Sequence, residues 1–142
     1  MALVTRVKTS TPIRRKQELY SDFFTDLLSL DVTRDIAKAV NEDAVKQSIR
    51  NLLLTNRGDR LFNNTLGSDI YSLLFENSSP ALEQTLSDYI KTTIENYEPR
   101  AELIDVVVDS EADEHEVLVV INFRVLNKTE PVSLELVLNR IR

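Results

Sequence analysis

The sequence predicts a single α+β domain in which helices pack on one face of a small antiparallel sheet. At 142 residues, the chain has the usual length of one domain, about 100–150 residues. Apolar residues recur at helical spacing between positions 41 and 97, and after Pro99 the apolar period changes to two. Helices followed by three strands with short polar links favour an antiparallel meander. We expect the domain to span residues 21–142, after a basic extension at residues 1–20.

The composition excludes several classes of protein. Apolar residues make up 42% and charged residues 28% of the chain, as in soluble globular domains. There is no cysteine, and the only histidine is His115, so we expect neither a metal site nor a cofactor. A net charge of −6 argues against nucleic-acid binding. The sequence contains no membrane-span pattern and no signal-peptide core, and we expect an intracellular protein.

Charge is unevenly distributed along the chain. Residues 1–17 contain five cations and no acid, which is typical of a solvated arm, with an arm that orders on an acidic partner as the alternative. Five acids lie between Asp109 and Glu116, between two strand-like runs. We interpret this acidic cluster as a solvated hairpin loop.

The first helix is expected from Asn41 to Thr55. The Asn41 side chain can cap it, and Val45, Ile49, Leu52 and Leu53 form one apolar stripe. Gly58 is a natural left-handed stop. The preceding segment, residues 22–40, is not settled as helix or loop. Its apolar residues are hydrophobic enough to be buried: Phe23, Phe24, Leu27, Leu28 and Leu30.

Two more helices follow. A short one is expected at about Ser68–Phe75, with Ser68 and Asp69 competing for its cap. The next begins at Ser79, a good cap, with Pro80 at the first helical position, and Pro99 ends it. Its apolar face comprises Leu82, Leu86, Tyr89, Ile90, Thr93, Ile94 and Tyr97. The core is also expected to include Phe62, Leu74 and Phe75.

Three runs then alternate with the period of a strand. The first has Ile104, Val106 and Val108 on one face. The inward face of the second is Val117, Val119, Ile121, Phe123 and Val125. The inward face of the third is Val132, Leu134, Leu136 and Leu138.

The residues favour a protein without catalytic activity. A Ser–His–Asp triad would need His115, which lies in the acidic hairpin, where an imidazole is poorly held. Gly58 and Gly67 are too far apart for a phosphate loop. Paired carboxylates remain open, but a glycosidase needs an acid in an apolar pocket beside a sugar cleft, and the chain has no Trp platform. We assign no catalytic residue.

Glu98, Pro99 and Arg100 form the most distinctive local motif, at a helix-to-strand joint. Pro99 fixes the backbone, so its charged neighbours project from a rigid corner. Arginine can grip a carboxylate or helix-end carbonyls through two hydrogen bonds. The motif is therefore either a docking site or an internal ion pair that pins the joint, and the residues alone leave both open.

The segment "LLLTNRGDRLFNNTLGSDIYSLLFEN", followed by "IENYEPRAEL", resembles the baseplate wedge protein family of contractile-tailed phages. That family has counterparts in type VI secretion baseplates and contractile bacteriocins. The resemblance covers roughly Ile49 to Leu138. It departs from the family where Leu61 and Asn64 stand in place of prolines expected after Arg60.

The resemblance implies a structural subunit of the virion baseplate, assembled in the host cytoplasm. Glu98–Pro99–Arg100 would contact the helical core bundle of other wedge proteins. From the residues themselves, Arg60 is either a solvated loop charge or a weaker partner contact, and Gly58 and Gly67 are expected to form turns. The strands resemble the strand-exchange domain of the sheath protein, so the first tail sheath ring would add along one edge. The candidate edge contains neither proline nor lysine and comprises Val132, Ser133, Leu134, Glu135, Leu136, Val137 and Leu138. The alternative is that a sheet neighbour or a loop covers it. Tail tube or hub proteins are further candidate partners.

Two other functions remain as alternatives. The family once carried a lysozyme-like label, which implies a tail-associated peptidoglycan hydrolase. A free-standing adaptor whose basic arm binds an acidic protein is the third hypothesis.

Overall fold

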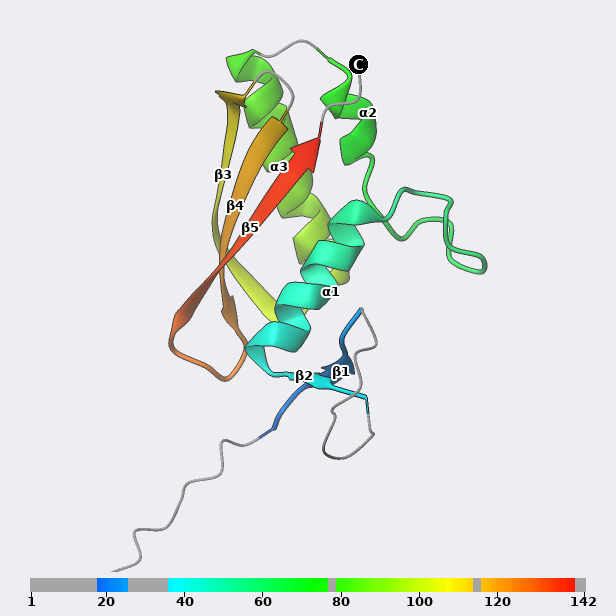
Figure 1. Ribbon diagram of the computed structural model, residues 1–142, viewed down its shortest axis with the longest axis vertical. Helices are drawn as coiled ribbons and strands as arrows, with labels where there is room; N and C mark the ends of the chain where they lie inside the picture. The colour runs from blue at the N-terminus through cyan, green and yellow to red at the C-terminus, as the bar shows by residue number, and fades with distance from the viewer. Residues whose placement is uncertain (1–17, 26–35, 77–78, 114–115, 140–142) are drawn as a thin grey trace, which may run out of the picture.

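The computed structural model of the chain describes residues 18–25, 36–76, 79–113 and 116–139 (Figure 1). The predictions for the basic arm at residues 1–17, for Leu27, Leu28 and Leu30, and for His115 lie outside the described residues. Among the described residues, no helix is both long and apolar enough to cross a membrane.

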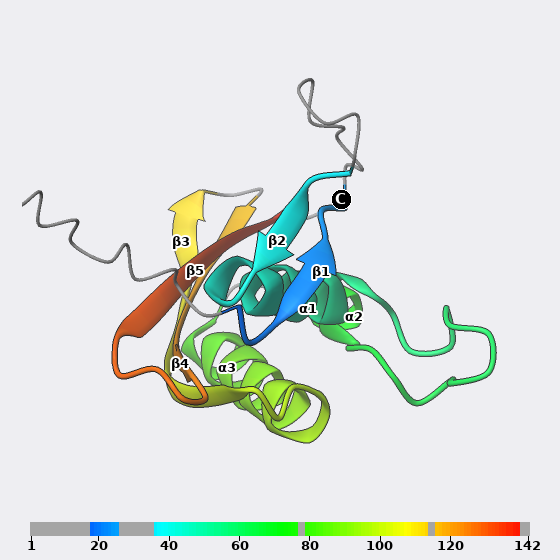
Figure 2. The ribbon, with the colours of Figure 1, turned by 90° about the horizontal axis from the view of Figure 1, so that it is seen from below.

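The fold is α+β, as predicted, with the helices on one face of a three-stranded antiparallel sheet (Figures 1 and 2). The strand order is β3-β4-β5, so the central strand is β4. The elements are β1 (Ser21–Phe23), β2 (Lys38–Val40), α1 (Glu42–Leu54), α2 (Ile70–Leu74), α3 (Pro80–Tyr97), β3 (Ala101–Asp113), β4 (Glu116–Val125) and β5 (Pro131–Asn139). The short strands β1 and β2 form a separate antiparallel pair beside α1.

The core lies between the sheet and α1 and α3. The predicted inward face of β4 is completely buried: Val117, Val119, Ile121, Phe123 and Val125. It packs with Ile49 and Leu53 of α1 and with Leu86 and Ile90 of α3 in one apolar cluster. Burying these side chains is the main favourable contribution to folding, about 1.5–3 kcal/mol each.

The ends of α3 agree with the sequence. The Ser79 hydroxyl accepts a hydrogen bond from the backbone N–H of Leu82 at 3.2 Å, and Pro80 is the first helical residue. The helix ends at Tyr97, two residues before Pro99, with Glu98 at the C-cap. Local capping chemistry and the proline therefore determine both ends.

The start of α1 differs from the prediction, because the Asn41 side chain does not cap the helix. Asn41 has a left-handed backbone, with φ of 52°. Its side-chain oxygen accepts from the backbone N–H groups of Leu19 at 2.8 Å and Tyr20 at 3.3 Å. The amide thus joins the N-terminal segment to the helix. Gly58 does not end α1 either, since Thr55 is already extended.

The first sheet strand is longer and less regular than predicted. β3 continues to Asp113, so the acidic cluster lies largely in strands rather than in a hairpin loop. A register shift between Leu103 and Asp105 interrupts the alternation. Ile104 lies at this irregularity and is 56% exposed, so it does not share the buried face of Val106 as the alternation predicted.

Three aromatic residues expected to be buried are exposed. Phe23 lies on the outer pair of strands and is 52% exposed, while Phe75 follows α2 and is 69% exposed. Phe62 is fully exposed in the loop between α1 and α2, which extends away from the body of the domain (Figure 1). Leu74 is buried as expected. Apolar character alone therefore overestimates the core, because burial also requires an opposing element.

Candidate functional site

The motif Glu98–Pro99–Arg100 forms a corner between α3 and β3. The Glu98 backbone N–H donates to Ile94 O at 2.8 Å, which closes the helix. The Ala101 N–H donates to Glu98 O at 3.1 Å, and Arg100 O accepts from the Leu126 N–H at 2.8 Å. The corner backbone is therefore fixed from both sides by the helix end and by the turn after β4.

Glu98 and Arg100 form an ion pair within the chain. Arg100 Nε donates to Glu98 Oε1 at 2.6 Å, and Nη2 donates to Oε2 at 2.7 Å. The Glu98 side chain is only 3% exposed, whereas that of Arg100 is 33% exposed. The internal pair is thus present, and Arg100 still reaches solvent.

Electrostatics keep Glu98 ionised although it is buried. Burial alone would raise its pKa, but hydrogen bonds from Arg100 and from the Ser48 hydroxyl outweigh burial, so the pKa lies below the ordinary glutamate value. Ser48 belongs to α1. A single carboxylate therefore connects α1, the corner and Arg100.

The guanidinium of Arg100 also faces the N-terminal segment. Its central carbon lies 5.7 Å from the centroid of the Tyr20 ring, within the range of a cation–π contact. Pro99 is exposed to solvent. The solvent-facing surface of the motif consequently consists of Pro99 and part of Arg100, while Glu98 lies beneath them.

Arg60 lies near the same corner. It lines a hollow of about 150 Å³ together with Ser48 and Tyr97. The Tyr97 hydroxyl donates to Thr65 O at 2.7 Å and so ties the end of α3 to the loop that carries Arg60. Arg60 therefore shares this hollow with the Ser48 that supports Glu98.

Both glycines of the loop have positive φ angles. Gly67 has φ of +128°, and a Cβ there would lie 2.6 Å from Thr55 O. Gly58 has φ of +90°, with nothing within 4 Å of a Cβ. Gly67 thus permits a close backbone approach, whereas Gly58 only permits a turn.

The segment Val132–Leu138 lies in β5, which is an edge of the sheet. In the described part of the chain, no strand pairs with the outer side of β5. Val132, Leu136 and Leu138 point into the core, and Leu134 is partly buried. The edge is therefore paired with β4 on one side and with no described strand on the other.

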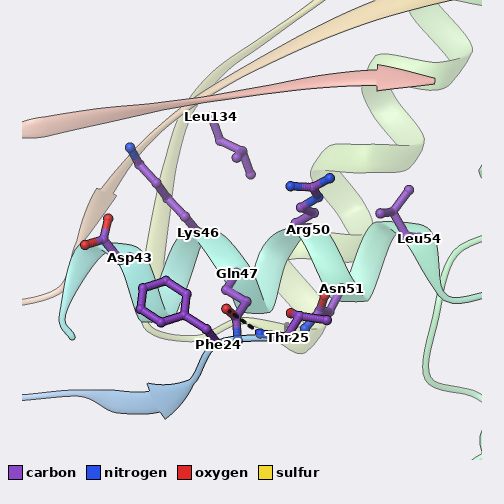
Figure 3. A pocket seen from close by; sticks show the side chains of 9 residues that line it. All are labelled: Phe24, Thr25, Asp43, Lys46, Gln47, Arg50, Asn51, Leu54 and Leu134. Carbon is purple, nitrogen blue, oxygen red and sulfur yellow. Dashed lines mark hydrogen bonds between the residues drawn. The ribbon is translucent and has the colours of Figure 1, made fainter. Parts of the chain in front are cut away.

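Sequence reasoning missed two surface features. Leu61, which is 84% exposed, and Phe62 form an apolar loop tip. The sequence signal for it is a pair of adjacent apolar residues within a polar loop. The second feature is a groove of about 630 Å³ beside α1, lined by Lys46, Arg50 and Leu134 among others (Figure 3). Most of its lining residues belong to α1, but its two sides come from Phe24 and Leu134, which are distant in sequence, so no local pattern signals it.

Comparisons with known proteins give a consistent family. The sequence profile of a family described as "Baseplate wedge protein gp25" matches residues 39–130. The curated baseplate wedge protein gp25 of Enterobacteria phage T4 is 29% identical over 116 residues, which cover 82% of this chain and 87% of that protein.

Solved structures share the fold. A Geobacter sulfurreducens protein described as a tail lysozyme is 25% identical with a TM-score of 0.66, covering 71% of this chain and 92% of that chain. A chain in the baseplate of the anti-feeding prophage is 20% identical with a TM-score of 0.60, and 87% of each chain is covered. A chain in the type VI secretion baseplate complex is 16% identical with a TM-score of 0.55, covering 67% of this chain and 89% of that chain.

Proposed function

This chain belongs to the baseplate wedge protein gp25 family, and on that premise we propose that it is a non-enzymatic subunit of a contractile-tail baseplate. It acts as a stoichiometric building block of the virion baseplate, and the baseplate assembles in the host cytoplasm. Its partners are other wedge proteins at the Glu98–Pro99–Arg100 corner and the first sheath ring along β5. The observation that carries the proposal is the rigid, partly exposed corner.

The corner suits docking because its geometry is fixed before a partner arrives. Hydrogen bonds hold the backbone on both sides of Pro99, so little conformational freedom is lost on binding. An arginine has five N–H donors, and the Glu98 carboxylate uses Nε and one on Nη2. The remaining donors of Arg100 can bind helix-end carbonyls or carboxylates of a partner bundle, with Arg60 nearby as a second cation.

The sheath ring is proposed to join by strand addition. An open strand edge offers backbone N–H and C=O groups to an incoming extended segment. β5 has such an edge. Proline and lysine commonly block strand addition, and neither occurs between Val132 and Leu138.

The test is co-purification of tagged variants with the proteins of the native baseplate. Arg100→Ala alone is ambiguous, because it removes both the docking group and the partner of Glu98. We therefore pair it with the double variant Glu98→Met/Arg100→Leu, which removes the guanidinium without leaving a buried carboxylate unpaired. Loss of wedge partners by both variants, with the double variant as stable as wild type, supports docking. Retention of all partners by the stable double variant rejects it.

A peptidoglycan hydrolase is the second candidate, favoured by the structural relative described as a tail lysozyme. Such an enzyme needs a carboxylic acid whose pKa is raised. Glu98 is the most buried carboxyl in the corner, but its pKa is lowered and both its oxygens hold Arg100. Release of soluble glycan from purified peptidoglycan by the wild-type chain, abolished by replacing one carboxylate, would establish the enzyme in place of the structural subunit.

A further inference from the structure

A groove runs along the outward face of α1, directly beside the open edge of β5 (Figure 3). The helix forms its floor, Leu134 of β5 lies on one side, and Phe24 lies on the other. Its volume is about 630 Å³. A strand added to β5 would therefore cover this part of α1.

Hydrogen bonds hold the side of the groove opposite β5. The Gln47 amide of α1 donates to Phe23 O, and its side-chain oxygen accepts from the Thr25 N–H at 3.3 Å. Both contacts join α1 to the residues at the end of β1. The groove therefore lies between elements that hydrogen bonds hold in place.

Two cations of α1, Lys46 and Arg50, project from the floor towards β5 (Figure 3). Within the described residues, neither takes part in an ion pair. Asp43 lies towards the N-terminal end of the groove. The positive potential is therefore concentrated between Lys46 and Arg50, close to where a new strand would lie.

The spacing of these cations matches the repeat of a strand. Residues four apart on a helix are separated by about 6 Å along its axis. Alternate residues of a strand, which share one face, are separated by about 6.7 Å. α1 and β5 run in the same general direction in both views (Figures 1 and 3). Successive inward side chains of an added strand would consequently face Lys46 and Arg50 in turn.

We propose that the groove selects an extended partner segment with acidic side chains at two alternate positions, which pair with Lys46 and Arg50. Apolar side chains on the same face of that segment lie over Leu134 and Leu54. This inference rests on the proposed strand addition and specifies the chemistry of the added strand. Residues 1–17 of this chain carry five cations and no acid, so their charge opposes binding in this groove.

Synthetic strand peptides can test the selection by fluorescence anisotropy. The acidic peptide has Leu, Glu, Glu and Leu at alternate positions with Thr between them, and its counterpart has Lys in place of both Glu. Wild type should bind the acidic peptide about tenfold more tightly, the scale expected when two partly exposed ion pairs replace two like-charge contacts. Lys46→Glu/Arg50→Glu should reverse this preference. The matched control Lys91→Glu/Arg124→Glu makes the same charge change on α3 and β4, at residues that do not line the groove, and should preserve it.

A third peptide separates this inference from strand addition itself. The acidic peptide N-methylated throughout cannot form the backbone ladder, and it should lose binding. Equal binding of the acidic and basic peptides, both lost on N-methylation, would overturn the charge selection and leave strand addition intact. Preferential binding that survives N-methylation would overturn strand addition, and no binding of any peptide would overturn both. Sedimentation can also detect self-association of the chain. If the chain self-associates and the acidic peptide disrupts that association, the occupant of the groove is a second copy of the chain, which would overturn the proposed partner.

Discussion

The guanidinium of Arg100 holds both carboxylate oxygens of Glu98, at 2.6 Å and 2.7 Å, across the proline that separates them. Glu98 is buried at this corner, and the Ser48 hydroxyl of α1 donates to it as well. One ion pair consequently links the end of α3, the start of β3 and the middle of α1. The same arginine also presents a third of its side chain to solvent. The stability of the corner and its proposed docking role therefore meet in one residue.

Arg100→Ala should destabilise the fold, because it leaves the Glu98 carboxylate buried without its partner. We expect a loss of about 1–3 kcal/mol, below the full range for a buried pair because 33% of the Arg100 side chain is exposed. Glu98→Met/Arg100→Leu should recover most of this loss. Urea unfolding followed by circular dichroism measures both. An Arg100→Ala variant as stable as wild type would show that the pair does not pin the corner.

The stability contributed by Glu98 should depend on pH. Its pKa in the folded chain is lowered, so the contribution is fully present above the ordinary glutamate value of about 4.3 and disappears as pH falls through the folded pKa. Wild type should accordingly lose its advantage over Glu98→Gln in strongly acidic buffer. The other carboxyls are common to both chains and cancel in the difference. Unfolding curves at neutral and acidic pH measure it, and a constant difference would contradict the assignment.

Gly67→Ala should be more damaging than Gly58→Ala. Gly67 combines φ of +128° with a Cβ position 2.6 Å from Thr55 O, so alanine would be strained and would clash with backbone. We expect a loss of about 1–3 kcal/mol or more, against about 1 kcal/mol at Gly58, where space is open. Thermal melts of the two variants provide the comparison. Equal losses would mean that the loop moves to accept the added methyl group.

Strand addition at β5 should be blocked by a charge on the groove side of its edge. Leu134→Glu places a carboxylate on the side that faces α1, where it repels the acidic side chains proposed for an incoming strand and disrupts its apolar contacts. Val137→Glu is the control, since Val137 belongs to the same strand and is 54% exposed. Electron microscopy of assembled tails should show baseplates without sheath for Leu134→Glu only. Normal sheath on baseplates that contain Leu134→Glu would reject addition at this edge.

Several elements follow from local sequence alone. The limits of α3 were predictable because Ser79, Pro80 and Pro99 act on their own neighbourhood of the backbone. The inward face of β4 was predictable because strict alternation leaves one arrangement that buries five apolar side chains. The motif Glu98–Pro99–Arg100 was recognisable as a rigid helix-to-strand joint for the same local reason.

Only the tertiary structure decided how that joint and the surface around it are used. Asn41 accepts from Leu19 and Tyr20 instead of capping α1, since an amide binds whichever donors the fold brings to it. Glu98 is buried and accepts from Ser48 of α1, while Tyr20 of the N-terminal segment faces its partner Arg100, and no local pattern records those neighbours. The groove likewise exists only because α1 packs beside the edge of β5. The sequence by itself thus determined which segments are helices and strands, through short-range backbone and burial preferences. Contacts between distant residues determined which of the charged groups pair within the chain and which remain exposed to solvent.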